Sequence, residues 1–294
     1  MIIIEILKAL LYGIVEGITE WLPISSTGHL IILEELIPFR FSDNAEFMAE
    51  FWEMFEVVIQ LGAIIAVIVL FWNKLWPFGR KKSAAEKKQT WTLWLKVIVG
   101  CIPAGFVGVV VDKLIEKATG KDIDGWIYNA TVVALALIVY GVAFIVIEKV
   151  NKNKQYKVES VHNITFPLAL EIGCFQAISI IPGTSRSGST ILGSMLFGVS
   201  RPASAEFAFF LAIPVMGGAS FIKVLGFLKY LSGSGVSVPS AAWLTLAVGC
   251  IVSFLVSIAA IRFLTDFVKK HSFSAFGWYR IALGLLVLVW FLVR

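Results

Sequence analysis

The chain has 294 residues, of which 58% are hydrophobic and 15% are charged, and its mean hydropathy is +0.86. Soluble domains average about 45–50% apolar and about 25% charged residues, so this chain carries more apolar surface than one aqueous core can bury. That composition excludes a cytosolic enzyme, a disordered chain and a small secreted disulfide scaffold, and we expect membrane lipids as partners. The net charge of +5 comes from short basic runs between apolar segments, so nucleic acid is not an expected partner.

Six stretches are long and apolar enough to cross a bilayer, whose hydrocarbon core of about 30 Å needs roughly 20 helical residues. They cover about residues 55–72, 90–111, 125–147, 202–222, 240–262 and 276–293. Two other apolar regions, 1–37 and 160–200, are each interrupted midway by proline, glycine and hydroxyl residues. Because irregular backbone at membrane depth must be covered by protein or water, we expect each of these regions to form a re-entrant helical hairpin.

The basic loops predict how the spans are oriented. Segments 74–88 and 149–159 both carry an excess of lysine and arginine, which favours the cytoplasmic side of the membrane. Two expected spans separate these loops, so the two assignments agree. The first hairpin would then enter from the outer face and the second from the cytoplasm.

Short matches relate the two halves of the chain. The matched segments are residues 23–28 with 182–188, 99–102 with 248–251, and 125–126 with 277–278. Each half would hold one hairpin and three spans, and this odd number of spans inverts the second copy. We expect a single all-helical membrane domain over 1–294, built from inverted repeats of about 1–148 and 159–294 with a basic linker at about 149–158. In such folds the site lies at the midplane, where the broken helices meet.

Two glutamates mark the first half-helix as a candidate site. Glu16 and Glu20 lie one turn apart on the same face of the helix. A carboxylate at membrane depth costs several kcal/mol unless it is paired, protonated or hydrated, which makes it a functional-site hypothesis. The pair could bind a divalent cation or supply a general base. Alternatively, the helix is shallow and both glutamates contact headgroup water.

Hydroxyl residues begin the half-helix that follows. Ser25, Ser26 and Thr27 could cap its free backbone N–H groups, and the same N–H groups would bind a phosphate. His29 lies within the first turn and is a candidate for proton transfer beside these hydroxyls and carboxylates. A single structural hydrogen bond is the alternative role for this histidine.

The second interruption carries an arginine. The charge of Arg186 cannot be neutralised, so its burial demands an anion. That anion could be Glu16 or Glu20 across the repeat interface, or a phosphate bound in bidentate fashion. The neighbouring candidate donors are Ser185, Ser187 and Thr190. Four further polar residues flank the interruptions and could support the site, namely Glu56, Gln60, Arg201 and Glu206.

Together these groups favour phosphoryl transfer on a lipid whose phosphate head lies at the midplane site. Such a reaction needs positioning and charge stabilisation above all. Inverted repeats with broken helices are also typical of secondary transporters, so a transporter or flippase for a lipid phosphate or another anion is the alternative. Nucleophile and proton-transfer candidates around one anion site favour the hydrolase, because transport needs no nucleophile.

Residues 16–29 and 182–190 closely resemble the two signature motifs of bacterial undecaprenyl-diphosphate phosphatases, the bacitracin-resistance family. The resemblance runs the length of the chain and includes residues 55–62 and 198–201. It implies an enzyme that hydrolyses undecaprenyl diphosphate to undecaprenyl phosphate and inorganic phosphate, recycling the lipid carrier for cell-wall synthesis and conferring bacitracin resistance. It also implies a need for Mg²⁺ or Ca²⁺, a site opening toward the outer face of the bacterial plasma membrane, and a homodimer.

The resemblance also assigns roles to residues of this chain. It makes Glu16 and Glu20 metal-binding or acid–base residues, and Ser26 and His29 the nucleophile and proton-shuttle candidates. The expected substrate-binding residues are Ser25, Thr27, Ser185, Arg186, Ser187 and Thr190. Either Ser26 or a water activated by Glu20 or His29 could attack the terminal phosphorus.

Overall fold

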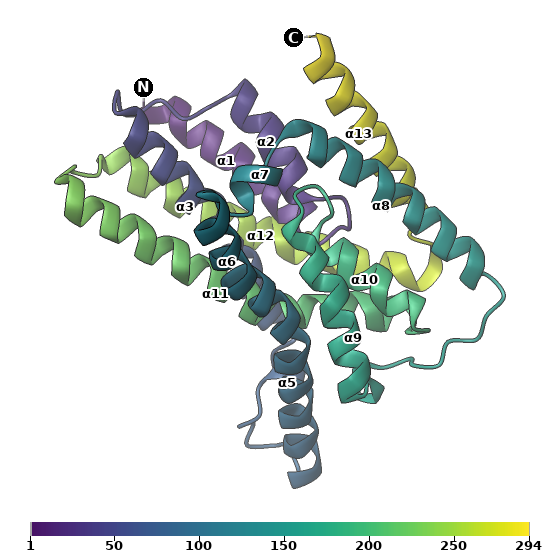
Figure 1. The fold of residues 1–294 in the computed structure, drawn as a ribbon. Coiled ribbons are helices and arrows are strands. Elements are labelled where there is room, and N and C mark those ends of the chain that lie inside the picture. Colours follow the sequence, from purple (N-terminus) through teal and green to yellow (C-terminus); the bar gives the residue numbers. More distant parts are fainter. Residues whose placement is uncertain (1, 294) are drawn as a thin grey trace.

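The computed structural model describes residues 2–293, which are almost entirely helical (Figure 1). Over that range the backbone forms no sheet, and a single isolated bridge pairs Val158 with Val199. Six segments are long and apolar enough to cross a membrane: Ala45–Leu70, Ala84–Thr119, Ala130–Asn151, Arg201–Ser234, Ser240–Lys270 and Ser274–Phe291. The prediction of an all-helical protein with six spans is confirmed, and the protein is a multi-pass membrane protein.

The spanning helices differ from the predicted stretches at their ends: most begin earlier or end later, whereas the span predicted from residue 125 begins at Ala130, after a separate short helix. They are α3 (Ala45–Leu70), α5 (Ala84–Gly105), α8 (Ala130–Asn151), α11 (Arg201–Ser234), α12 (Ser240–Lys270) and α13 (Ser274–Val293). A π-helical segment (Phe106–Val111) joins α5 to α6 (Asp112–Thr119), so these three form one long span. Short helices lie in the connections: α4 (Trp72–Leu75), α7 (Asp124–Ile127) and the 3₁₀ turn Val161–Asn163.

Both expected interruptions are present as breaks between shorter helices. The first separates α1 (Ile2–Thr19) from α2 (Ser26–Leu36). The second separates α9 (Phe166–Ala177) and its 3₁₀ extension (Ile178–Ile180) from α10 (Arg186–Leu196). Each break contains a proline, which cannot donate a backbone hydrogen bond and which disfavours helical backbone at the residue before it. The chain therefore turns at these points instead of continuing as one long helix.

Glycines let the shorter helices pack closely against spanning helices. A Cβ atom on Gly13 of α1 would lie 2.7 Å from the carbonyl oxygen of Gly249 on α12. A Cβ atom on Gly173 of α9 would lie 2.2 Å from the carbonyl oxygen of Gly100 on α5. Such close backbone approach is the usual basis of helix association in membranes. These contacts hold the ends of α1 and α9, and thus both breaks, inside the helical bundle (Figure 1).

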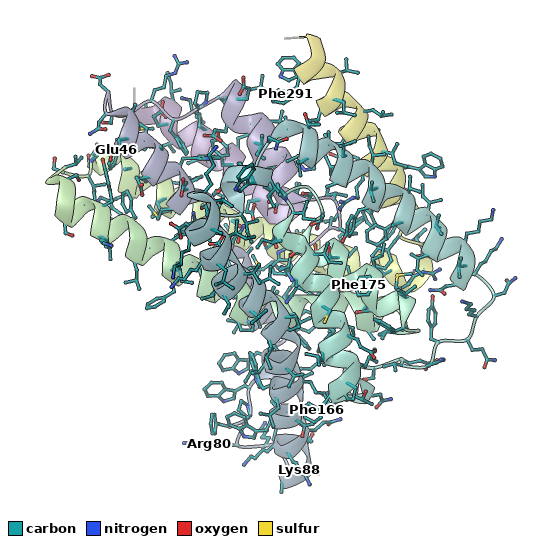
Figure 2. All side chains as sticks on the ribbon, viewed as in Figure 1. Glu46, Arg80, Lys88, Phe166, Phe175 and Phe291 are labelled. Carbon is teal, nitrogen blue, oxygen red and sulfur yellow. The ribbon has the colours of Figure 1, made fainter. Side chains whose placement is uncertain are left out.

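Charged residues gather at opposite ends of the molecule. Arg80 and Lys88 lie at the end to which α5 projects, whereas Glu46 lies at the other end, near the start of α3 (Figure 2). The start of α1 and the end of α13 lie on the same side of the molecule as the start of α3 (Figure 1). Helices α8 and α13 run side by side, because Gly141 and Gly277 each leave room for the other's backbone. This close packing carries the first turns of α13 toward both breaks.

Candidate active site

Helices α2 and α10 begin in the same way. Ser25 has a φ of 73° and its Oγ accepts a hydrogen bond from the Gly28 N–H at 3.4 Å. Ser185 has a φ of 69° and its Oγ accepts from the Gly188 N–H at 3.1 Å. A positive φ is uncommon for a residue with a side chain, and each such residue costs on the order of 1–3 kcal/mol that surrounding contacts must offset. Ser25 therefore caps its helix as expected, Ser185, which we expected to bind substrate, caps its helix in the same way, and the strain marks both breaks as candidate functional segments.

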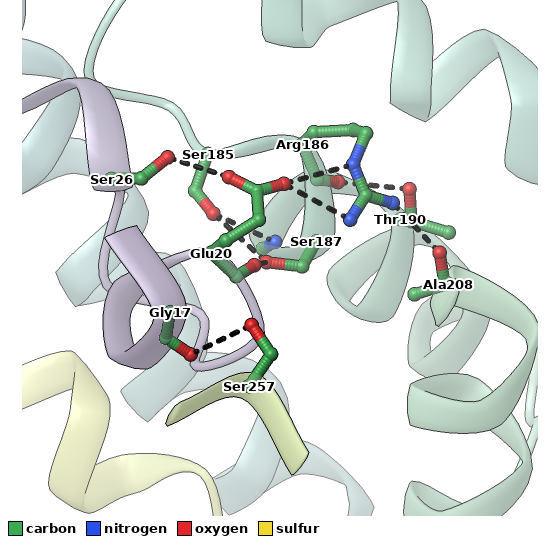
Figure 3. A network of polar contacts seen from close by, with 10 residues as sticks. Gly17, Glu20, Ser26, Ser185, Arg186, Ser187, Thr190, Ala208 and Ser257 are labelled. Atoms are coloured by element: carbon green, nitrogen blue, oxygen red, sulfur yellow. Dashed lines mark hydrogen bonds and ion pairs between the residues drawn. The ribbon is translucent and has the colours of Figure 1, made fainter. Parts of the chain in front are cut away.

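Glu20 joins the two breaks. Its Oε2 accepts a hydrogen bond of 2.6 Å from Ser26 Oγ, and its Oε1 accepts from Nε and Nη2 of Arg186 at 3.3 and 3.2 Å (Figure 3). Arg186 also donates from Nη1 to the Ala208 carbonyl at 2.7 Å, and its guanidinium lies 5.9 Å from the ring centre of Trp21. Of the two anions expected for Arg186, the protein carboxylate is the one it contacts here.

A cavity of about 170 Å³ opens beside this ion pair. It is lined by Glu20, Ser26, Thr27, Gln60, Ser179, Ile181, Pro182, Gly183, Ser185, Arg186, Val215, Met216 and Ala219. Five of the residues predicted for the site thus face one space, and they come from both breaks. The wall formed by α11 is apolar. A cavity with a few convergent polar groups on one side and apolar residues on the other suits an amphipathic ligand.

A larger cavity, of about 420 Å³, lies at the connection between α8 and α9. Its lining includes Asn151, Lys154, Gln155 and Lys157, but no carboxylate and no hydroxyl beside a base. The chemistry therefore assigns the smaller cavity, not the larger one, as the candidate active site.

Glu16 is fully buried one turn before Glu20. Neither of its carboxylate oxygens has a hydrogen-bond partner among the described residues. Within residues 2–293 no group of three or more His, Cys, Asp or Glu side chains could hold a metal ion. A hard divalent cation binds six or more oxygen ligands, so Glu16 and Glu20 could supply only part of its coordination. The unpartnered oxygens of Glu16 fit such a ligand, and substrate and water oxygens would have to complete the set.

His29 faces away from the ion pair. Its Nδ1 lies 2.7 Å from the Ser25 carbonyl and its Nε2 lies 2.7 Å from the hydroxyl of Tyr279, whose ring stacks on the imidazole at 5.8 Å. Because a carbonyl can only accept, we assign the proton to Nδ1, so that Nε2 accepts from Tyr279. None of these hydrogen bonds involves Ser26 or Glu20. The base next to Ser26 is therefore Glu20.

Two further side chains that we predicted to bind substrate donate their hydrogen bonds to backbone carbonyls instead. Ser187 Oγ donates to the Glu20 carbonyl at 2.9 Å, and Thr190 Oγ1 donates to the Arg186 carbonyl at 2.9 Å (Figure 3). Both side chains are buried and neither lines the cavity. The ring of donors facing the cavity is thus smaller than expected, and these two hydroxyls hold the breaks in place.

The four flanking polar residues occupy different positions. Gln60 lines the cavity, and Glu56 accepts a hydrogen bond of 3.3 Å from Tyr128. Arg201 and Glu206 do not face the cavity, because they form ion pairs elsewhere. Nε of Arg201 donates to Glu148 at 2.8 Å, and Glu206 accepts from Lys74 at 2.7 Å.

Sequence reasoning missed two residues of α13. Arg280 is fully buried and donates hydrogen bonds to three backbone carbonyls in the two breaks, and Tyr279 contacts His29. A signal was present, because an arginine within an apolar membrane helix is itself a functional-site hypothesis.

Comparison with known proteins identifies the family of this chain. A family model described as bacitracin resistance protein BacA matches residues 9–286. A relative from Enterococcus faecalis, named undecaprenyl-diphosphatase, is 49% identical over 292 residues, which make up 99% of both chains. A relative from Clostridioides difficile, named undecaprenyl-diphosphatase 1, is 50% identical over 289 residues, or 98% of this chain and 97% of the relative. A match of this length and identity shows that the chain belongs to the bacitracin resistance protein BacA family.

Proposed function

We propose that this protein is an undecaprenyl-diphosphatase. It hydrolyses undecaprenyl diphosphate to undecaprenyl phosphate and inorganic phosphate, which recycles the lipid carrier for cell-wall synthesis and confers resistance to bacitracin. The observation that carries this proposal is the full-length identity of about half to relatives with that name. The site supports it independently, because a hydroxyl, its base and a guanidinium border one cavity at the meeting point of two broken helices.

In the proposed reaction, Ser26 Oγ attacks the terminal phosphorus of the diphosphate. Its proton passes along the 2.6 Å hydrogen bond to Glu20 Oε2, and the bond from that phosphorus to the bridging oxygen breaks. Undecaprenyl phosphate leaves with the bonding electron pair. Water then attacks the phosphoserine, Glu20 returns its proton to Ser26 Oγ as the P–Oγ bond breaks, and dihydrogen phosphate is released. A hydroxyl within hydrogen-bond reach of a base is the general signature of such a nucleophile. A water activated by Glu20 is the alternative.

Arg186 would change partners during this reaction. When Glu20 takes up the proton, its carboxylate loses the charge that holds the guanidinium at 3.2 Å. The Arg186 N–H groups then become available to the phosphoryl oxygens, which guanidinium binds well in a bidentate geometry. Proton transfer from the nucleophile and stabilisation of the transferred group would thus be coupled through one side chain.

Glu16 and Glu20 would hold a divalent cation, Mg²⁺ or Ca²⁺, as the family resemblance implies. When bound, the cation would offset the charge of the diphosphate, which is its usual contribution to phosphoryl transfer. The support is the burial of Glu16 without a hydrogen-bond partner among the described residues. The side chains of Ser25, Ser185, Ser187 and Thr190 would hold the two breaks around the substrate.

We further propose that the protein consists of two inverted repeats, about 1–148 and 159–294, and that each break belongs to a re-entrant hairpin. Support comes from the matching caps at Ser25 and Ser185 and from the packing of α1 on α12 and of α9 on α5. The basic end near Arg80 would lie in the cytoplasm. As the family resemblance implies, the cavity would open toward the outer face, with the prenyl chain along the apolar wall of α11.

The test is phosphate release from undecaprenyl diphosphate by the purified protein in detergent, with and without Mg²⁺ or Ca²⁺. We expect cation-dependent release that is lost in Glu20→Gln and Arg186→Ala. The matched controls are Glu116→Gln and Arg262→Ala, which alter exposed residues outside the cavity and should keep full activity. Absence of release by folded wild-type protein would contradict the proposal. Movement of lipid phosphate across liposomes by the same protein would then favour the transporter alternative.

A further inference from the structure

Arg280 occupies a position that the proposed mechanism does not use. Its side chain is fully buried on α13, where the packing of Gly277 against the Gly141 carbonyl brings this helix close to α8. The guanidinium lies 5.4 Å from the ring centre of Tyr140 on α8. Arg280 is thus held where α13, α8 and the two breaks meet.

The hydrogen bonds of Arg280 reach both breaks. Nη1 donates to the Pro23 carbonyl at 3.1 Å, and Nη2 donates to the carbonyls of Gly183 and Thr184 at 2.7 and 3.0 Å. These carbonyls lie just before the first residues of α2 and α10. Among the described residues, no carboxylate lies within 4 Å of the guanidinium, and Nε has no hydrogen-bond partner. Its only polar partners are therefore main-chain oxygens of the two breaks.

The surrounding backbone leaves room for this guanidinium. A Cβ atom on Gly188 would lie 3.2 Å from Arg280 Nη1, so a larger residue there would press against it. Gly183 presents its carbonyl at a φ of +90°, and a Cβ atom at that position would lie 2.5 Å from the Val133 carbonyl oxygen. Gly188 in the first turn of α10 thus leaves space for the guanidinium, and Gly183 in the second break adopts the backbone direction that presents its carbonyl.

A guanidinium suits this contact better than other side chains do. It presents five N–H donors in a rigid plane and keeps its charge, so it can bind several carbonyls from two segments together. A neutral amide has only two donors on one nitrogen. A lysine ammonium is a point charge on a flexible stem and would not fix the relative orientation of the two segments.

We propose that Arg280 is a positioning residue for diphosphate hydrolysis, joining the two breaks through their carbonyls so that Ser26 and Arg186 keep their relative geometry. Ser26 lies three residues after the bonded Pro23, and Arg186 lies two residues after the bonded Thr184. The inference rests on the proposed function, because Ser26 and Arg186 are the groups that it aligns. Arg280 itself lines no part of the cavity and is not a catalytic residue.

The experiment compares Arg280→Ala and Arg280→Lys with Arg262→Ala, which alters an exposed arginine of α12. For each folded variant, kcat and KM for undecaprenyl diphosphate are measured, and the assay is repeated with added guanidinium ion. Misplacing reacting groups by about 1 Å can lower a rate by roughly 100-fold. We expect a loss of that order in kcat for Arg280→Ala, with a much smaller change in KM. Guanidinium ion should restore part of kcat in Arg280→Ala only.

Gly188→Ala provides a second variant that keeps Arg280 and crowds it, because the added Cβ atom would lie 3.2 Å from Arg280 Nη1 as well as 3.2 Å from Ser185 Cβ. It should also lower kcat more than KM and should not respond to guanidinium ion. An unchanged kcat in Arg280→Ala would overturn the inference. If Arg280→Ala fails to fold, an unchanged kcat in Gly188→Ala would overturn it instead. Inactive wild-type protein would contradict the proposed function itself, whereas active wild-type protein with unaffected variants would contradict only the role of Arg280.

Discussion

The buried ion pair between Glu20 and Arg186 leads to a prediction in which a double variant regains stability but not phosphatase activity. The exposed fractions of the Glu20 and Arg186 side chains are 8% and 9%, so water screens this pair little. Replacing one partner leaves the other charge buried without its counter-ion, which typically costs 3–5 kcal/mol, whereas replacing both by apolar residues is often neutral. We therefore expect Glu20→Met and Arg186→Met each to destabilise the protein by about 3–5 kcal/mol, and the double variant to recover most of that loss.

The phosphatase assay should give a different pattern. Glu20→Met removes the base bonded to Ser26, and Arg186→Met removes the proposed phosphoryl ligand, so the double variant should be as inactive as either single variant. Thermal unfolding in detergent measures the stability of all four proteins. Soluble domains of about 150–250 residues shift by roughly 2–4 °C per kcal/mol, so a loss of about 3–5 kcal/mol corresponds to at most roughly 6–20 °C in Tm for this longer chain.

The exposed ion pair between Lys269 and Asp266 is the matched control. These side chains lie 2.9 Å apart at exposed fractions of 55% and 79%, where water and side-chain entropy make an ion pair weak. Its double-mutant cycle should show little coupling. If the coupling free energy between Glu20 and Arg186 is no larger than that of this control, the two buried charges do not stabilise each other and the reasoning is refuted.

Three further predictions use the same assays. Ser26→Ala should lower kcat by at least about 10³-fold, as loss of a nucleophile does in related mechanisms. Wild-type enzyme quenched with acid during turnover should contain phosphoserine at position 26. An active Ser26→Ala protein would favour water as the nucleophile. Tyr279→Phe removes the hydroxyl group that donates a hydrogen bond to Nε2 of His29. A hydrogen bond of about 1 kcal/mol corresponds to roughly a fivefold change in rate, so an equal rate in the two proteins would exclude a role for this contact. Burial, followed by the nearby charge of Lys74, lowers the pKa of His162. Below about pH 6.5 the unfolded chain therefore binds more protons than the folded protein, so the Tm of the wild-type protein should fall as the pH drops through this range. Thermal unfolding at several pH values should show a smaller fall in Tm for His162→Asn than for the wild-type protein.

The positions of the breaks could be predicted because their causes are local. A proline and a glycine close together beside hydroxyl residues disfavour continuous helix, whereas the single prolines Pro103 and Pro214 lie inside α5 and α11, and a serine three residues before a glycine N–H can cap the next helix without any distant contact. The cap at Ser25 is present as expected, and Ser185 forms an equivalent cap that we did not predict. The number of spans followed from apolar length alone, which depends on the bilayer and not on the packing of the helices.

Contacts between distant segments could not be predicted in the same way. Arg280 lies 257 residues from Pro23, to which it donates, and Tyr279 lies 250 residues from His29. The sequence indicated that Arg186 in the second break would need an anion, and Glu16 and Glu20 were the two carboxylates predicted for that role. It did not indicate that Thr190 would donate to its own helix, because a threonine can bond the carbonyl four residues back in any helix. The homodimer stays a prediction from the family resemblance.

The four buried ionisable groups of the site suggest how the protein would bind a diphosphate in an apolar environment. Glu20 and Arg186 form an ion pair, whereas Glu16 has no hydrogen-bond partner and Arg280 donates its hydrogen bonds to carbonyl oxygens alone among the described residues. An isolated buried charge is costly, and its cost falls when an ion of opposite sign arrives. A cation would provide that ion for Glu16, and the diphosphate, although it lies beyond contact distance, would add negative charge near Arg280. Substrate and cation together would therefore bind more strongly than either alone, because a cation bound at Glu16 attracts the diphosphate and cancels the negative charge that would otherwise repel it.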